Sequence, residues 1–389
     1  MELYIFNRDL EFQGIIDNFT SLIWRRRYFN SGGFELQCAL TTQNLNLLAR
    51  ENIIFKKDGS EITGEAGVIS YRNLKQGTEG KEILVLKGSF LTGYLNRRII
   101  WGTEVLNATT EATIRKLIND NGINPINTDR IIPNLLLNDL NNFTNEVDYQ
   151  VSYANMLEEI ESLASVSELG FKIDFDINNK TLAFDIYEGL DRSVNQEVNL
   201  KCIFSKEFEN ILEQEYVDSL NNYKNLCLIG GVGEGTARKL VTIGNSIGLD
   251  RFEVFADQRS LSNEVDTIPM ADADYTNLLI GKGNETLAET KEIQTFDSKI
   301  NLNSNLKYKV DFDLGDIITI TSKKWGMTLD SRITEVEEIY EEQGQQINIT
   351  FGNNIPTLID KIKSMSKQQS SSGGTGSITI TSIDGGTFI

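Results

Sequence analysis

The first hundred residues alternate apolar and polar positions in short runs, which is the period of a β-strand. Within residues 81–90, Ile83 and Val85 fall on one face and Leu84 and Leu86 on the other. We therefore expect both faces of that strand to be covered. The region as a whole predicts a β-barrel or a β-sandwich.

Helical spacing follows in the middle of the chain. Thr109 or Thr110 can cap a helix that stops at Gly122. Residues 152–169 repeat apolar side chains at intervals of three and four before Gly170, and we interpret this stripe as core packing.

Strand patterns return in the second half. Residues 171–177 and 182–186 predict a hairpin with one apolar face, and residues 306–351 predict a second β unit that opens with an alternating stretch at 308–314. Residues 271–290 favour a helix broken by two glycines. The polar face of the hairpin offers oxygen ligands for a cation, but without calcium-loop spacing a solvated face is the expectation. Its acidic residues are Asp174, Asp176 and Asp185.

The end of the chain differs in composition. Pro356 opens a predicted helix to about residue 366, and residues 367–389 hold a Ser/Gly linker and one strand in which Ile378 and Ile380 alternate with threonine. A tethered strand can add to the edge of another chain's sheet; a disordered terminus is the alternative.

These patterns predict an α+β chain that is mainly β, with two antiparallel β-barrel or sandwich domains and helical and mixed insertions. The expected parts are an N-terminal barrel-like domain (1–105), a helical segment (106–170), a mixed segment that completes the first barrel or stands beside it (171–265), a second barrel-like domain with a terminal helix (266–366) and the linker with its strand (367–389).

Composition removes several chemistries. The 389 residues include no histidine, which excludes imidazole bases, Ser-His-Asp and Cys-His nucleophilic sites, and histidine-ligated metals. Cys38, Cys202 and Cys227 are far apart and form no C-x-x-C, so we expect buried free thiols. We expect neither a transmembrane helix nor a secretory signal.

The net charge of −19 argues against sequence-specific nucleic-acid binding, because phosphates are recognised by Lys and Arg. The same charge would suit a lumen through which DNA slides without sticking. Ordinary acidic solubility is the simpler interpretation.

The stretch LIGGVGEGTARKL at residues 228–240 contains part of a dinucleotide-binding fingerprint, G-x-G-x-x-G. The third glycine of the fingerprint is missing, because Thr236 occupies its position and Gly235 comes one residue early. A glycine-rich hairpin is therefore the expectation, with nucleotide binding as the alternative.

Seven separated stretches occur in a fixed order: SLIWRRRYFNSGGFEL (21–36), GYLNRRIIWG (93–102), IFSKEFENI (203–211), NNYKNLCLIGGVGEGTAR (221–238), GLDRFEVFADQR (248–259), DLGDIITI (313–320) and INITFG (347–352). Together they resemble a family of siphophage and prophage tail proteins that is similar to the baseplate hub of contractile-tailed phages. The resemblance covers about residues 1–366.

The resemblance implies a structural, non-enzymatic hub without a cofactor. Such hubs are homotrimers at the distal end of the tail tube, and each chain contributes two tube-protein-like β-barrel domains. The implied partners are the tail tube protein, a baseplate or distal tail protein, and a central spike. The implied location is the tail of a virion or of a phage-like particle such as a tailocin, assembled in the bacterial cytoplasm.

The arginines at 25–27 form the one dense cationic site in this acidic chain. Strand alternation would place Arg25 and Arg27 on one face and Arg26 on the other. In a trimer they would pair with a neighbour's carboxylates, for example at 207–218, and the alternative is a solvated strand edge. The interface candidates are Trp24, Arg25, Arg26, Arg27, Arg238, Arg251, Ile378 and Ile380.

An alternative function is a tail-associated cell-wall glycoside hydrolase that works with paired carboxylates. The chain has 56 acidic residues, and no sequence feature singles out one pair. We therefore assign no residue a catalytic, cofactor-binding or metal-binding role.

Overall fold

The computed structural model describes residues 1–57, 61–76, 80, 82–265 and 267–352. Sixteen of the described strands belong to one large sheet, and the expectation of a mainly β chain of the α+β class is confirmed. The predicted helix after Pro356, the linker, and the strand with Ile378 and Ile380 lie outside the described residues.

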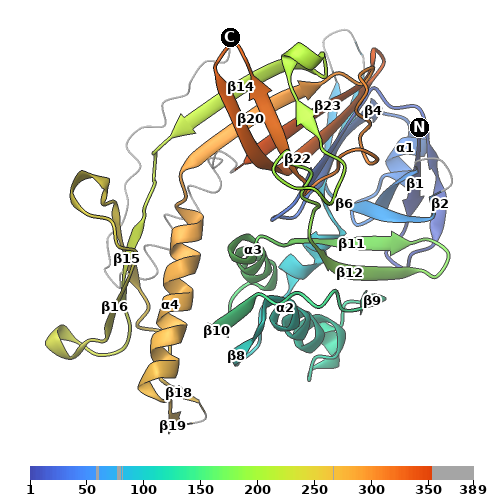
Figure 1. Ribbon diagram of the computed structural model, residues 1–389. Helices are drawn as coiled ribbons and strands as arrows, with labels where there is room; N and C mark the ends of the chain where they lie inside the picture. Colours follow the sequence, from blue (N-terminus) through green and yellow to red (C-terminus); the bar gives the residue numbers. More distant parts are fainter. Residues whose placement is uncertain (58–60, 77–79, 81, 266, 353–389) are drawn as a thin grey trace.

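The centre of the large sheet is a row of eight described strands in which every neighbouring pair is antiparallel. Figure 1 shows the row running from β14 on the left towards β6 on the right. In spatial order the strands are β14 (Ile211–Ser219), β20 (Ile293–Ile300), β23 (Gly344–Gly352), β22 (Met327–Glu341), β3 (Ser21–Arg27), β4 (Gly33–Ala39), β7 (Glu82–Phe90) and β6 (Thr63–Gln76).

The row joins the two ends of the chain at one seam, where β3 pairs with β22. Four strands from the N-terminal part lie on one side of this seam. Three strands from the C-terminal part lie on the other side with β14, which comes from the middle of the chain. Among the described strands the pairing closes no barrel. Both halves therefore form one open sheet.

Further strands extend this sheet on both sides of the seam. A hairpin, predicted from its alternating pattern, continues from β6, and two short parallel pairings attach β9 and β13. The remaining strands of the sheet are β1 (Glu2–Phe6), β2 (Phe12–Ile16), β5 (Ile53–Lys57), β9 (Leu135–Leu137), β11 (Gly170–Asp176), β12 (Thr181–Tyr187), β13 (Ile203–Phe204) and β21 (Ile317–Ser322).

The predicted helices at 110–122 and 152–169 exist with shorter bounds, as α2 (Thr110–Ile118) and α3 (Met156–Ser167). The Thr109 hydroxyl accepts a hydrogen bond from the Ala112 amide, and Asn155 caps α3 in the same way. Both helices pack with the β8 (Thr103–Thr109) and β10 (Glu146–Ser152) pair in the core below the large sheet (Figure 1). None of the described helices is long and apolar enough to cross a membrane.

The predicted break in residues 271–290 is wrong, because α4 (Asp272–Glu289) is continuous. Its two glycines permit close approach instead. A Cβ on Gly281 would lie 2.6 Å from the Asp148 carbonyl oxygen, and one on Gly283 would lie 2.7 Å from Ile229 Cδ1. The helix is therefore packed tightly on both sides. On one side lie β10 and α3, and on the other lies the small sheet β16 (Leu240–Ile243), β15 (Leu226–Gly230) and β17 (Glu253–Asp257) (Figure 1).

The alternating stretch 308–314 does not form the predicted strand. Tyr308 and Phe312 make only an isolated bridge, and Lys309 between them has a positive φ of 65°. Apolar alternation here reflects burial of Phe312 and Leu314 in a core cluster, not strand pairing.

The shorter elements complete the chain. They are α1 (Thr42–Leu47), the pair β18 (Glu264–Val265) and β19 (Ile268–Pro269), the 3₁₀ helices at Leu91–Arg97, Thr128–Arg130, Lys206–Phe208, Gly235–Ala237 and Gly248–Asp250, and a π-helical turn at Asn119–Ile123.

Candidate functional site: the polar face of the eight-strand row

One face of the eight-strand row is mostly polar, although the register also places Ile23, Ile339 and Val85 on it. Directly paired residues lie on the same face of a sheet, so the register traces this face across all eight strands. We call the following residues the polar face: Glu213, Glu215, Asp297, Lys299, Asn348, Thr350, Glu335, Glu337, Arg25, Arg27, Glu35, Gln37, Val85, Lys87, Tyr71 and Asn73. The opposite face carries the apolar core.

Charges on the polar face pair across neighbouring strands. The Arg25 Nε lies 3.1 Å from a Glu335 carboxylate oxygen, and the Arg27 Nε lies 2.7 Å from the other. Arg25 also pairs with Glu337. These side chains are a fifth to two fifths exposed, so each pair contributes little free energy, but together they cover the seam with paired charge.

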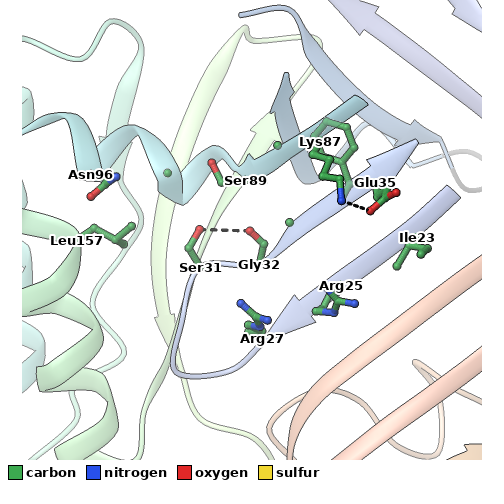
Figure 2. Close-up of a pocket in the computed structure, with 14 residues that line it drawn as sticks. Ile23, Arg25, Arg27, Ser31, Gly32, Glu35, Lys87, Ser89, Asn96 and Leu157 are labelled. Atoms are coloured by element: carbon green, nitrogen blue, oxygen red, sulfur yellow. Dashed lines mark hydrogen bonds and ion pairs between the residues drawn. The ribbon is translucent and has the colours of Figure 1, made fainter. Parts of the chain in front are cut away.

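A hollow of about 420 Å³ lies in the polar face beside the seam. Figure 2 shows Arg25 and Arg27 along one side of it and Lys87 reaching Glu35 across the neighbouring strands. Glu35 is the one carboxylate among the lining residues. The hollow therefore does not offer the pair of carboxylates that glycoside hydrolysis uses.

On the core side of the seam, Arg26 is held between the two parts of the chain. Its Nε donates to Glu65 of β6 at 2.5 Å, and its Nη1 donates to Asp313 at 2.6 Å and to the Tyr308 hydroxyl at 2.8 Å. The Arg26 side chain is 11% exposed. Burial disfavours the charged guanidinium, but the facing Glu65, Tyr308 and Asp313 together more than offset this, so the pKa of Arg26 is raised.

A second buried pair, Lys56 of β5 with Glu338 of β22, continues this network. The Tyr308 hydroxyl, which accepts from Arg26, donates to Glu338 at 3.2 Å, and Tyr340 donates to the same carboxylate. Lys56 and Glu338 are 6% and 2% exposed. We call Arg26, Lys56, Glu65, Tyr308, Asp313, Glu338 and Tyr340 the seam network.

The predicted alternation of the arginine triplet is confirmed, with Arg26 facing away from its two neighbours. Their carboxylate partners lie in the same chain, on β6, β22 and the loop before β21, and not at 207–218. Trp24 is buried at 1% exposure. Contact of these residues with a neighbouring chain stays a prediction.

The glycine-rich stretch forms a hairpin, as expected, because β15 and β16 pair antiparallel around it. Gly233 and Gly235 have positive φ angles of 100° and 55°. The Arg238 guanidinium donates to the carbonyls of Gly230 and Gly231, pairs with Asp257 and lies over the Phe255 ring. Arg238 thus connects the glycine-rich loop to Asp257 of β17 within the chain.

The other residues singled out in the sequence contact partners that are close to them in the sequence. Arg251 pairs with Glu253 two residues away. On the hairpin, Asp174 pairs with Lys172, and Asp176 accepts from the backbone and side chain of Asn179. Within the described ranges, no group of three or more acidic or cysteine side chains is placed to hold a metal ion.

All three cysteines are free and buried, as predicted. Burial raises the pKa of the thiols of Cys38 and Cys227 to about 11 and that of Cys202 to about 12. We expect none of them to react with a disulfide reagent in the folded chain at about pH 8, because the thiolate is the nucleophile. Titration before and after denaturation checks this, and rapid reaction of the native chain would contradict the burial.

Acid should weaken the seam network. Burial alone would raise the pKa of Glu338, but Lys56, Lys309 and the Tyr340 hydroxyl together more than offset it, so the pKa lies below the ordinary 4.5. The ionised carboxylate therefore stabilises the fold above about pH 4.5, and this contribution is lost as the pH falls through the folded pKa. We expect Glu338→Gln to flatten the acid limb of the unfolding free energy, whereas Glu341→Gln, at an exposed position, leaves it unchanged.

The fold of this chain, an open antiparallel sheet with a helical insertion, is similar to the fold of solved prophage tail proteins. The MuSo2 prophage 43 kDa tail protein from Shewanella oneidensis matches with a TM-score of 0.53 at 11% identity, over 90% of this chain and 98% of that one. Prophage tail protein gp18 from Listeria monocytogenes EGD-e matches with 0.52 at 13%, over 96% and 100%. The tail protein from Neisseria meningitidis MC58 matches with 0.53 at 11%, over 90% and 96%. These likenesses establish a shared fold.

The chain belongs to the Siphovirus ReqiPepy6 Gp37-like protein family, whose model matches residues 2–353. This confirms the resemblance to siphophage and prophage tail proteins that the seven motifs indicate. Comparison with curated proteins gives no match.

Proposed function

We propose that this chain is a non-enzymatic hub protein of a phage or prophage tail tip, at the distal end of the tail tube. Its family and its fold support a tail component. The observation that carries the hub role is the unbroken row of eight described strands with one polar face. A sheet with one solvated and one apolar face suits the wall of a water-filled passage.

The proposed assembly is a homotrimer. The row consists of two four-stranded halves that meet at the seam, so three copies would present six similar halves. Six halves match a sixfold tube on one side, and the threefold axis matches a spike on the other. The halves would belong to two tube-protein-like domains near 1–105 and 266–366, each completed by strands from the middle of the chain.

The passage would let DNA through without binding it. The polar face carries six carboxylates and four cations, so it has an acidic excess that repels phosphate. The partners of the hub would be the tube protein, a baseplate or distal tail protein and the spike. Assembly would take place in the bacterial cytoplasm, into a virion or a DNA-free particle.

Light scattering on the purified full chain tests the assembly. We expect a mass three times the 43.7 kDa of one chain. A version that ends at Ser366 shows whether Ile378 and Ile380 are needed, because loss of the trimer on truncation would make that segment a clasp between subunits. A monomer at every concentration would contradict the trimer.

The hydrolase alternative has a separate test. We expect no release of reducing ends from purified peptidoglycan, because the hollow in the polar face presents a single carboxylate. Sustained turnover by the purified chain, lost when one acidic residue is replaced, would overturn the non-enzymatic role.

A further inference from the structure

The eight-strand row ends in two backbone edges that no described strand covers. β14 pairs with β20 alone. Residues 71–76 of β6 pair with β7 alone, because β5 and β11 cover only the earlier part of that strand. A free edge presents unpaired N–H and C=O groups. Since every neighbouring pair in the row is antiparallel, the two edge strands run in opposite directions, as a further antiparallel pairing requires.

The two free edges carry opposite charge. β14 has the acidic residues Glu213, Glu215 and Asp218 and no basic residue. Residues 71–76 of β6 have Arg72 and Lys75 and no acidic residue. The edge of β6 is therefore a cationic segment on a strongly acidic chain.

A hollow of about 500 Å³ lies at the β6 edge, and Arg50, Arg72 and Tyr71 line it. Within the described part of the chain, Arg50, Arg72 and Lys75 form no ion pair. The Arg72 Nη2 donates to the Leu45 carbonyl at 2.9 Å, but its buried Nε has no acceptor. Two arginines without an ion-pair partner among the described residues line this hollow, which therefore fits an acidic group from outside the chain.

We propose that β14 of one copy pairs antiparallel with residues 71–76 of β6 in the next copy, so that its acidic side chains face Arg50, Arg72 and Lys75. This inference rests on the proposed homotrimer and names its contact. Pairing would also cover Leu212 and Leu74, which are 50% and 53% exposed.

The charges also determine the symmetry of the contact. Two β14 edges would repel each other, and so would two β6 edges, because each edge carries charge of one sign. The contact is therefore head-to-tail, with two different surfaces. A head-to-tail contact generates a closed ring when its rotation closes. Three copies joined in this way would continue the polar face around the ring.

Charge reversal in matched pairs tests the contact. We expect Arg72→Glu with Lys75→Glu to reduce the mass by light scattering from three chains to one, and Glu215→Lys with Asp218→Lys to do the same. Combining all four substitutions should restore the trimer, because the charges are then exchanged. Lys180→Glu with Lys324→Glu, at exposed turn positions, should keep the parent mass.

Unchanged circular dichroism and an unchanged unfolding midpoint would show that each variant is folded. If the parent is a trimer and both reversed pairs keep its mass, the contact is wrong while the hub role stands. If each reversed pair dissociates the trimer but the combination stays monomeric, the direct pairing of the two edges is wrong. A parent that is monomeric throughout overturns the contact and the solution trimer together.

Discussion

Replacing Glu338 with alanine is expected to lower the free energy of unfolding by about 3–5 kcal/mol, the usual effect of removing one partner of a buried ion pair. Lys56 would be left buried at 6% exposure without its carboxylate. The Tyr308 and Tyr340 hydroxyls would lose the same acceptor. Because these groups come from both sides of the seam, the loss should loosen the junction between the two halves. Chemical denaturation of the variant and the parent measures it.

Two controls separate burial from charge. Glu337→Ala removes a partner of the more exposed Arg25 on the polar face and should change stability by at most about 1 kcal/mol. Lys56→Met with Glu338→Leu replaces the pair by apolar groups and should recover much of the loss. If Glu338→Ala were no worse than Glu337→Ala, the seam network would not hold the halves together.

Gly88→Ala is expected to lower the free energy of unfolding by about 3 kcal/mol, the upper end of the usual range for overpacking. A Cβ on Gly88 would lie 1.8 Å from the Val68 carbonyl oxygen and 2.7 Å from Phe34 Cε1. Neither the backbone of β6 nor the buried ring can move away freely. The substitution should therefore separate β7 from β6 within the row.

Gly64→Ala is the matched control on β6. The added Cβ would lie 3.7 Å from Phe55 Cε2, which is an ordinary contact. Its chief effect would be on the unfolded chain, so we expect a neutral result or a gain of about 0.4–1 kcal/mol. Equal stability of the two alanine variants would contradict the packing of β6 against β7.

Local patterns predicted the elements whose partners are near in sequence. The hairpin of β11 and β12 followed from alternation, and α2 from its cap at Thr109. The pairing of β3 with β22 could not be predicted in this way, because more than 300 residues separate Arg25 from Glu337. The break predicted in α4 is absent because close packing on both sides of the helix outweighs the low helix propensity of Gly281 and Gly283.

The sequence predicted the positions of some residues of the candidate site but not their partners. Strand alternation placed the arginines of 25–27 on the correct faces, but their carboxylates are distant in the sequence. Lys56 carried a usable signal, since it directly follows the apolar residues Ile53, Ile54 and Phe55, all of which are buried. A charge in such a run indicates a buried partner without identifying it. The two free edges of opposite charge could not be predicted from the sequence, because only the strand order shows which strands lie at the edges of the row.

Electron cryo-microscopy of particles that contain this chain tests the central claim most directly. The account predicts three copies at the distal end of the tail tube, arranged in a ring, with the polar face of the eight-strand row turned to the lumen. A chain found elsewhere in the particle, or a ring with this face turned away from the lumen, would contradict it.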